Sequence, residues 1–281
     1  MIINPDYISN IIIDVANKHI VPRFNLLQKS EINSKSSPND LVTIADIESE
    51  KALDKILTEK FPESVLIGEE SISAGEKSVD ILREGHPMVW LTDPVDGTYN
   101  FVHGRPEFAL MLACIINGET QYSWIYDIPG KRMMVAEKGA GAFIGGERLK
   151  VSAPKSMAES DGFLGVRYYP KEIRPFLQDF EPKVKSMLTL GCSGHEYLQM
   201  TAGQRDFCVS PRCRVWDHIP GALAFQEAGG IITQWDGSEY TPTDDMCNLI
   251  AASNEELHHM LRLKLVDPML LMKESARMRM S

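Results

Sequence analysis

Six consecutive residues, Asp93-Pro94-Val95-Asp96-Gly97-Thr98, combine groups that bind a metal ion with groups that bind a phosphate. The apolar run just before them, residues 87–91, predicts a buried strand. A turn through Pro94 and Gly97 would let the two carboxylates point at one cation. Carboxylate oxygens suit Mg²⁺, which usually keeps coordination positions open for a substrate phosphate. Because the backbone N–H groups of Gly97 and Thr98 open a predicted helix, they offer a site for that phosphate.

Two further acidic positions lie at the ends of predicted elements. Glu69 follows a short strand predicted at residues 65–67, and Asp217 opens a helix predicted at residues 216–228. Taken singly, the Glu69-Glu70 pair could be solvated and Asp217 could be a helix N-cap. Four carboxylates gathered without a cation would repel one another strongly. We therefore expect Glu69, Asp93, Asp96 and Asp217 to meet around metal ions.

Hydrophobic periodicity and turn residues predict the elements that must position these groups. The predicted helices cover residues 7–27, 43–60, 170–184, 193–202, 216–228 and 254–265. The predicted strands cover residues 65–67, 87–91, 108–116, 121–128, 132–137, 205–209, 231–235 and 249–252. The glycines of residues 139–146 do not fit G-x-G-x-x-G, and they favour a hairpin over a dinucleotide-binding loop. These elements predict sheets layered between helices in two halves, residues 1–150 and 151–281.

The composition is that of a soluble globular protein, and it narrows the function classes. The formal charge of −10 argues against a nucleic-acid surface, which needs clustered Lys and Arg. No apolar run approaches the roughly 18 residues of a membrane span, and the N-terminus lacks a signal-peptide pattern. The 5 cysteines form no C-x-x-C pair, which argues against a zinc site or a disulfide framework. We therefore expect reduced thiols in a cytoplasmic protein.

The segments that carry these acids resemble the signatures of the inositol monophosphatase family, whose members are Mg²⁺-dependent, lithium-sensitive phosphatases. Residues 90–101 resemble the first signature, and residues 216–230 resemble the second. Gly68-Glu69-Glu70-Ser71 resembles a third motif, and residues 35–38 and 40–46 match the family's N-terminal segment. The likeness is closest to the bacterial branch called extragenic suppressor proteins. It implies an α+β fold, a layered α-β-α-β-α sandwich of the sugar-phosphatase type, and a homodimer.

The resemblance also implies roles for the matching residues. A first Mg²⁺ would be bound by Glu69, Asp93 and the carbonyl of Val95. A second would be bound by Asp93, Asp96 and Asp217, and a third, weaker ion would lie near Glu69. Thr98, oriented by Asp46, would help to activate water, and the N–H groups of Gly97 and Thr98 would hold the phosphate. The alcohol part of the substrate would meet Asp217, the residue at position 210 and the backbone of residues 191–193, which include Ser193.

The implied activity is hydrolysis of inositol 1-phosphate, or of a related small polyol phosphate, by metal-activated water. Ser210 stands where inositol-specific members carry a Glu, and a neutral hydroxyl cannot replace the charge-assisted hydrogen bonds of a carboxylate. Histidinol phosphate, fructose 1,6-bisphosphate and 3′-phosphoadenosine 5′-phosphate therefore stay open as substrates. His195 and Glu196 could face the substrate or lie on a helix surface, and we expect surface positions for Arg167 and Arg205.

A second hypothesis comes from the suppressor branch: a regulatory protein that binds the transcription machinery. The complete ligand set favours catalysis, and the acidity of the chain argues against direct RNA binding.

Overall fold

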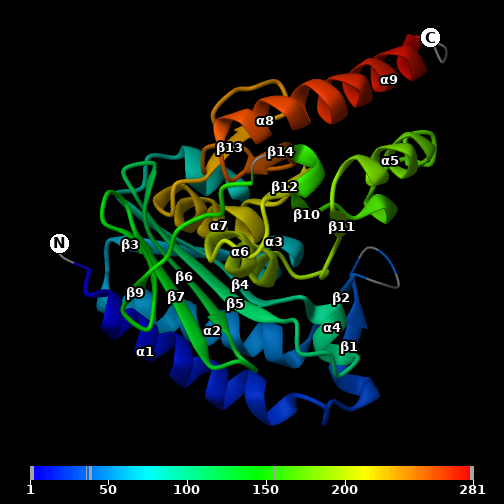
Figure 1. Ribbon diagram of the computed structural model, residues 1–281. Helices are drawn as coiled ribbons and strands as arrows, with labels where there is room; N and C mark the ends of the chain where they lie inside the picture. The colour runs from blue at the N-terminus through cyan, green and yellow to red at the C-terminus, as the bar shows by residue number, and fades with distance from the viewer. Residues whose placement is uncertain (1–2, 36, 38–39, 155, 279–281) are drawn as a thin grey trace.

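Two large β-sheets and the helices around them make up the chain (Figure 1). The computed structural model describes residues 3–35, 37, 40–154 and 156–278. The strands are β1 (Ile32–Ser34), β2 (Leu41–Thr43), β3 (Ser64–Gly68), β4 (Met88–Asp96), β5 (Ala109–Ile116), β6 (Glu119–Asp127), β7 (Arg132–Glu137), β8 (Gly141–Ile144), β9 (Glu147–Arg148), β10 (Asp161–Phe163), β11 (Ser186–Leu188), β12 (Phe207–Cys213), β13 (Ile231–Gln234) and β14 (Cys247–Ala252). The helices are α1 (Pro5–Val15), α2 (Ile44–Lys60), α3 (Glu69–Ser73), α4 (Thr98–Val102), α5 (Arg174–Phe180), α6 (Ser193–Thr201), α7 (Val215–Glu227), α8 (Glu255–Leu261) and α9 (Asp267–Met278).

The sheets and helices alternate in layers. A seven-stranded sheet has the order β3-β4-β5-β6-β7-β8-β9, and a five-stranded sheet has the order β11-β10-β12-β14-β13. One face of the seven-stranded sheet packs against α1 and α2, and its other face packs against α6 and α7. Buried residues of β13 and β14 join the same core as α7, while α5 and α8 cover the opposite face of the five-stranded sheet. This arrangement confirms the predicted α+β sandwich.

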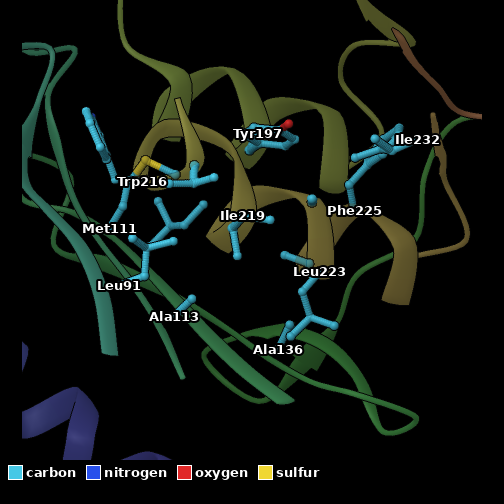
Figure 2. Packing of buried hydrophobic residues seen from close by; sticks show 14 of the residues in the cluster. Leu91, Met111, Ala113, Ala136, Tyr197, Trp216, Ile219, Leu223, Phe225 and Ile232 are labelled. Atoms are coloured by element: carbon cyan, nitrogen blue, oxygen red, sulfur yellow. The ribbon is translucent and has the colours of Figure 1, made fainter. Parts of the chain in front are cut away.

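Helix α7 is held flat on the seven-stranded sheet by apolar side chains. Figure 2 shows Trp216, Ile219 and Leu223 of α7 facing Leu91 and neighbouring residues of the sheet. All of these side chains are buried, so each stabilises the contact by about 1.5–3 kcal/mol relative to exposure. The packing matters for function because it fixes the first turn of α7, where Asp217 lies, against the end of β4.

Strands β3 and β4 are parallel, with Gly68 opposite Thr92. Their carboxyl ends therefore lie at the same edge of the sheet, and the chain leaves β3 directly into Glu69. Strand β4 is longer than the predicted 87–91 and continues to Asp96. Its pairing with β5 shifts register between Asp93 and Asp96, so the predicted turn is a bulge inside the strand.

Most predicted elements are confirmed, but two helices are shorter than their periodicity suggested. The helix predicted at 7–27 is regular only in α1 and gives way to a π-helical turn and a 3₁₀ turn around Pro22, after which Phe24 is extended. The helix predicted at 170–184 reduces to α5, which has Pro175 in its first turn and is followed by a 3₁₀ turn containing Pro182.

Several sequence-based expectations stay predictions. Ser36 and Pro38 of the matched segment 35–38, and Asn39 after it, lie outside the described residues. The division into halves at residue 150 stays a prediction. Within the described part of the chain, no helix combines the length and apolarity that crossing a bilayer requires.

Candidate active site

Three carboxylates meet where α7 passes over the ends of β3 and β4. Glu69, Asp93 and Asp217 each contribute one oxygen, and these oxygens all lie within 4.8 Å of one another. Asp93 is buried, whereas Glu69 and Asp217 are partly buried. The residues come from the start of α3, the bulge of β4 and the first turn of α7. The structure thus brings together three of the four acids that the sequence predicted to converge.

The electrostatics of this group favour a bound cation. Burial, and then the charges of Glu69, Asp96 and Asp217, raise the pKa of Asp93 well above its usual range. Burial and the charges of Glu69 and Asp96 likewise raise the pKa of Asp217. The carboxylates therefore resist being ionised together unless a positive charge lies among them. Their hard oxygens fit a divalent cation such as Mg²⁺.

The carboxylate of Asp96 is not among the three whose oxygens all lie within 4.8 Å of one another, and its role as a metal ligand stays a prediction. It accepts hydrogen bonds from the backbone N–H groups of Ser193 (3.1 Å) and Gly194 (2.5 Å), and from the thiol of Cys192 (3.0 Å). The bulge explains the difference, since it turns Asp96 toward the start of α6 and leaves Asp93 near Glu69. Asp96 remains close enough for its charge to act on Asp93 and Asp217.

A hydroxyl lies beside the acids, as predicted. Thr98 Oγ1 is 3.1 Å from Asp46 Oδ1 and 3.0 Å from the carbonyl oxygen of Val95, and it can donate its proton to either. Asp46 Oδ2 accepts from the N–H (2.9 Å) and the hydroxyl (2.5 Å) of Thr43, which caps α2. Burial raises the pKa of Asp46 to about 6, although the bonds from Thr43 act against it. The linked groups Thr43, Asp46 and Thr98 join α2 to the end of β4.

Gly97 has room for no other residue. Its φ of 87° is left-handed, and a Cβ there would lie 2.7 Å from the carbonyl oxygen of Glu107 and 3.0 Å from the Cβ of Cys192. This close approach brings the chain after β4 against residues 191–193. The phosphate contacts of Gly97 and Thr98, and the substrate contact of Ser193, stay predictions, and the proximity of the two segments is compatible with both.

Lys35 and Glu50 support the acidic site, although the sequence assigned a role to neither. The Nζ of Lys35 lies 2.7 Å from oxygens of both Glu69 and Glu70, and these two charges hold the pKa of Lys35 above its ordinary value despite burial. Glu50 accepts from the N–H groups of Glu70 (2.8 Å) and Ser71 (2.9 Å), which fixes the start of α3. The spacing of Asp46 and Glu50, four residues apart on one helix, was a signal that both face the same site.

His195 and Glu196 face the protein rather than the substrate. His195 Nε2 lies 3.2 Å from the carbonyl oxygen of Phe108 and 3.4 Å from Asp127. Glu196 accepts from the N–H of Leu190 (2.8 Å) and the hydroxyl of Thr189 (2.8 Å), and burial raises its pKa to about 7. Glu196 thereby holds the segment that leads into residues 191–193.

The remaining predicted residues lie in other surroundings. Ser210 is partly buried on β12, and its hydroxyl donates to the carbonyl oxygen of Arg212 (2.9 Å). Arg205 binds Ser186 (2.8 Å) and lies 3.6 Å from Asp161, while Arg167 is exposed. All 5 cysteines are free thiols, as predicted.

The three acids at the shared edge of two parallel strands, inside this layered fold, form a site that fits a divalent cation. A family model described as the inositol monophosphatase family matches residues 8–269. The chain therefore belongs to that family.

Individual relatives agree with this assignment. Human inositol monophosphatase 1 is 33% identical over 237 residues, which cover 82% of this chain and 83% of the relative. The Thermotoga maritima protein named fructose-1,6-bisphosphatase/inositol-1-monophosphatase is 32% identical over 208 residues, or 74% of this chain and 77% of the relative. Among solved structures, the extragenic suppressor protein SuhB of Bartonella henselae superposes with a TM-score of 0.79 at 26% identity, covering 92% of this chain and 98% of that one.

Proposed function

We propose that the chain is a Mg²⁺-dependent phosphomonoesterase that hydrolyses inositol 1-phosphate or a related small polyol phosphate. The observation that carries the proposal is the meeting of Glu69, Asp93 and Asp217 within 4.8 Å at a partly buried site. Membership of a phosphatase family supports the same reaction class. The cytoplasmic location, the homodimer and a partner in the transcription machinery stay predictions.

The residues present fit the implied metal ions. Glu69, Asp93 and the carbonyl of Val95 would hold one Mg²⁺, and Asp93, Asp96 and Asp217 would hold a second. Each carboxylate oxygen has two lone pairs, so the hydrogen bonds that Asp96 accepts leave it able to bind a cation as well. Magnesium at such a site polarises the phosphoryl group and lowers the pKa of water.

The chain's own residues would then place the attacking water and the phosphate. While Thr98 donates its proton to Asp46 or Val95, its oxygen can accept a hydrogen bond from a water and so orient it. The backbone N–H groups of Gly97 and Thr98 would bind the phosphate, and Ser193 and Asp217 would contact the alcohol. A phosphate monoester hydrolyses very slowly unaided, so electrostatic stabilisation of this kind is the main requirement.

Phosphate release tests the proposal directly. The test compounds are inositol 1-phosphate, histidinol phosphate, fructose 1,6-bisphosphate and 3′-phosphoadenosine 5′-phosphate, each with Mg²⁺, with Mg²⁺ plus lithium, and with a chelator. We expect hydrolysis that requires Mg²⁺, is inhibited by lithium and is lost in Asp93→Asn. A folded protein that releases phosphate from none of the four would refute the proposal.

A further inference from the structure

The loop between β10 and α5 places a cationic side chain beside the segment that leads to Ser193. Arg167 Nη2 lies 3.2 Å from the position that a Cβ on Gly191 would occupy. Gly191 also accepts a hydrogen bond from the side chain of Asn100 in α4 (3.4 Å). Two residues later, the N–H of Ser193 donates to Asp96. The guanidinium of Arg167 therefore lies beside Gly191, two residues before Ser193, in the segment predicted to contact the substrate alcohol.

Internal hydrogen bonds hold this loop in place. Arg174 donates to the carbonyl oxygens of Arg167 (3.0 Å) and Tyr169 (2.9 Å). The hydroxyl of buried Tyr169 donates to the carbonyl oxygen of Val209 (2.9 Å), the residue before Ser210. The loop that carries Arg167 thus borders both Gly191 and the strand of Ser210, and its backbone is fixed before any ligand binds.

The charge of Arg167 is available to a ligand. Its guanidinium lies over the ring of Tyr168, 4.8 Å from the centroid, and its Nη2 donates to the Tyr168 hydroxyl (2.6 Å). Among the described residues, no carboxylate lies within 4.0 Å of it, whereas Arg214 at the start of α7 pairs with Asp245 at 2.7 Å. Both Arg167 and Tyr168 are exposed. The guanidinium of Arg167 therefore stacks on Tyr168 through one face and forms no ion pair with a carboxylate of the described residues. Such a planar group can bind a phosphate through two parallel hydrogen bonds.

We propose that Arg167 is a specificity-determining residue that binds a second phosphate on the substrate. This inference rests on the proposed phosphatase activity and narrows it to small sugar or nucleoside bisphosphates. Ser210 supports the same preference, because a Glu at that position would place a negative charge near the second phosphate. Of the four candidate compounds, fructose 1,6-bisphosphate and 3′-phosphoadenosine 5′-phosphate carry a second phosphate, and inositol 1-phosphate and histidinol phosphate do not.

The test compares substrates that differ only in that phosphate. We expect the full-length protein with Mg²⁺ to show a higher kcat/KM for fructose 1,6-bisphosphate than for fructose 1-phosphate, by about 10- to 100-fold. Arg167→Gln should raise KM for fructose 1,6-bisphosphate by much more than KM for fructose 1-phosphate, and so remove the preference. Arg167→Lys should restore part of it. The preference should also weaken with added salt, because exposed charges are screened.

Two controls separate this inference from the proposed function. Arg148→Gln, on β9, removes the same charge from an exposed position elsewhere. It should leave kcat/KM for both fructose phosphates unchanged. Calorimetric binding of both sugar phosphates with Ca²⁺ in place of Mg²⁺ gives a readout that needs no turnover. If neither sugar phosphate is hydrolysed but the binding preference still depends on Arg167, the proposed phosphatase activity is refuted. The inference that Arg167 binds a second phosphate would then still stand. Equal kcat/KM for the two sugars in the unmodified protein, or an equal effect of Arg167→Gln on both, would refute the role of Arg167.

Discussion

Replacing Asp217 by Asn should make the metal-free protein more stable and the metal-loaded protein inactive. The oxygens of Glu69, Asp93 and Asp217 lie within 4.8 Å of one another. At an effective dielectric constant of about 20, each ionised pair at that separation costs about 3.5 kcal/mol, and Asp217 takes part in two pairs. None of the hydrogen bonds found among the described residues uses the Asp217 carboxylate, so the substitution loses only its attraction to Arg214 and Lys35.

Protonation limits how much stability the variant can gain. At pH 7.5, protonating one carboxyl whose ordinary pKa is about 3.9 costs about 5 kcal/mol. Repulsion therefore destabilises the unmodified metal-free protein by no more than about 5 kcal/mol, because beyond that one carboxyl takes up a proton instead. Losing a negative charge from the first turn of α7 costs up to about 1 kcal/mol. Partial exposure reduces the repulsion further. We expect a net gain of about 1–4 kcal/mol in chelator, or a rise in Tm of about 2–10 °C.

Magnesium should reverse this order. At a concentration 100 times its Kd, a bound ion stabilises the unmodified protein by about 2.7 kcal/mol, and the variant, which lacks one ligand, should gain less. The assay is thermal unfolding of both proteins in chelator and in Mg²⁺, with phosphate release measured alongside. Asp127→Asn is a matched control: Asp127 is a buried carboxylate paired with Arg132 (2.7 Å), so its loss should lower Tm equally in both buffers.

Two results would refute the reasoning. If Asp217→Asn lowers the Tm in chelator as much as Asp127→Asn does, repulsion among the acids is not a property of the metal-free site. If Mg²⁺ raises the Tm of all three proteins by the same amount, the ion does not bind at these carboxylates.

Three further predictions follow from single contacts. Thr98→Ala should lower kcat about 100-fold or more while Thr98→Ser keeps most of it, as measured by phosphate release, because only a hydroxyl can link Asp46 to the water. Glu50→Gln should raise the Mg²⁺ concentration needed for half-maximal rate by about 10-fold with kcat largely kept, because Glu50 fixes the backbone that carries Glu69. Burial opposes ionisation of Asp127, but bonds from His195, Arg132 and Gly130 lower its pKa to about 2. Denaturant unfolding should therefore show Asp127→Asn to be about 2 kcal/mol less stable above pH 4, and the difference should vanish as the pH falls through 2.

The sequence predicted the layers and the edge of the site because both depend on local patterns. Apolar runs bounded by turn residues mark β5 to β7, and the acids that follow β3 and β4 stand out in the sequence, whereas the parallel pairing that brings those strand ends together is seen only in the structure. The position of α7 was predictable only through the family resemblance, since nothing near Asp217 in sequence indicates which strand its helix crosses. The ends of the helices predicted at 7–27 and 170–184 were wrong. The first passes into a π-helical turn after Val15 and ends near Pro22, and the second is bounded by Pro175 and Pro182.

The orientation of Asp96 was beyond local reasoning. Its partners Ser193 and Gly194 lie 97 and 98 residues further along the chain, and the bulge that turns it toward them depends on pairing with β5. Lys35 and Glu50 were missed for the same reason, since each acts on a segment distant in sequence. Sequence patterns thus identify residues that have the right chemistry, and the fold decides which of them face one another.

The supporting contacts explain how a site of mutually repelling acids can stay assembled. Glu50 holds the backbone after Glu69, and the start of α6 holds Asp96, so neither position depends on the cation. Lys35 pairs with Glu69 and Glu70 and offsets part of the repulsion. Because the backbone hydrogen bonds fix these positions in the folded chain, the repulsion is relieved by binding a cation rather than by rearrangement. The same rigidity that destabilises the empty cluster would favour binding of the proposed metal ions.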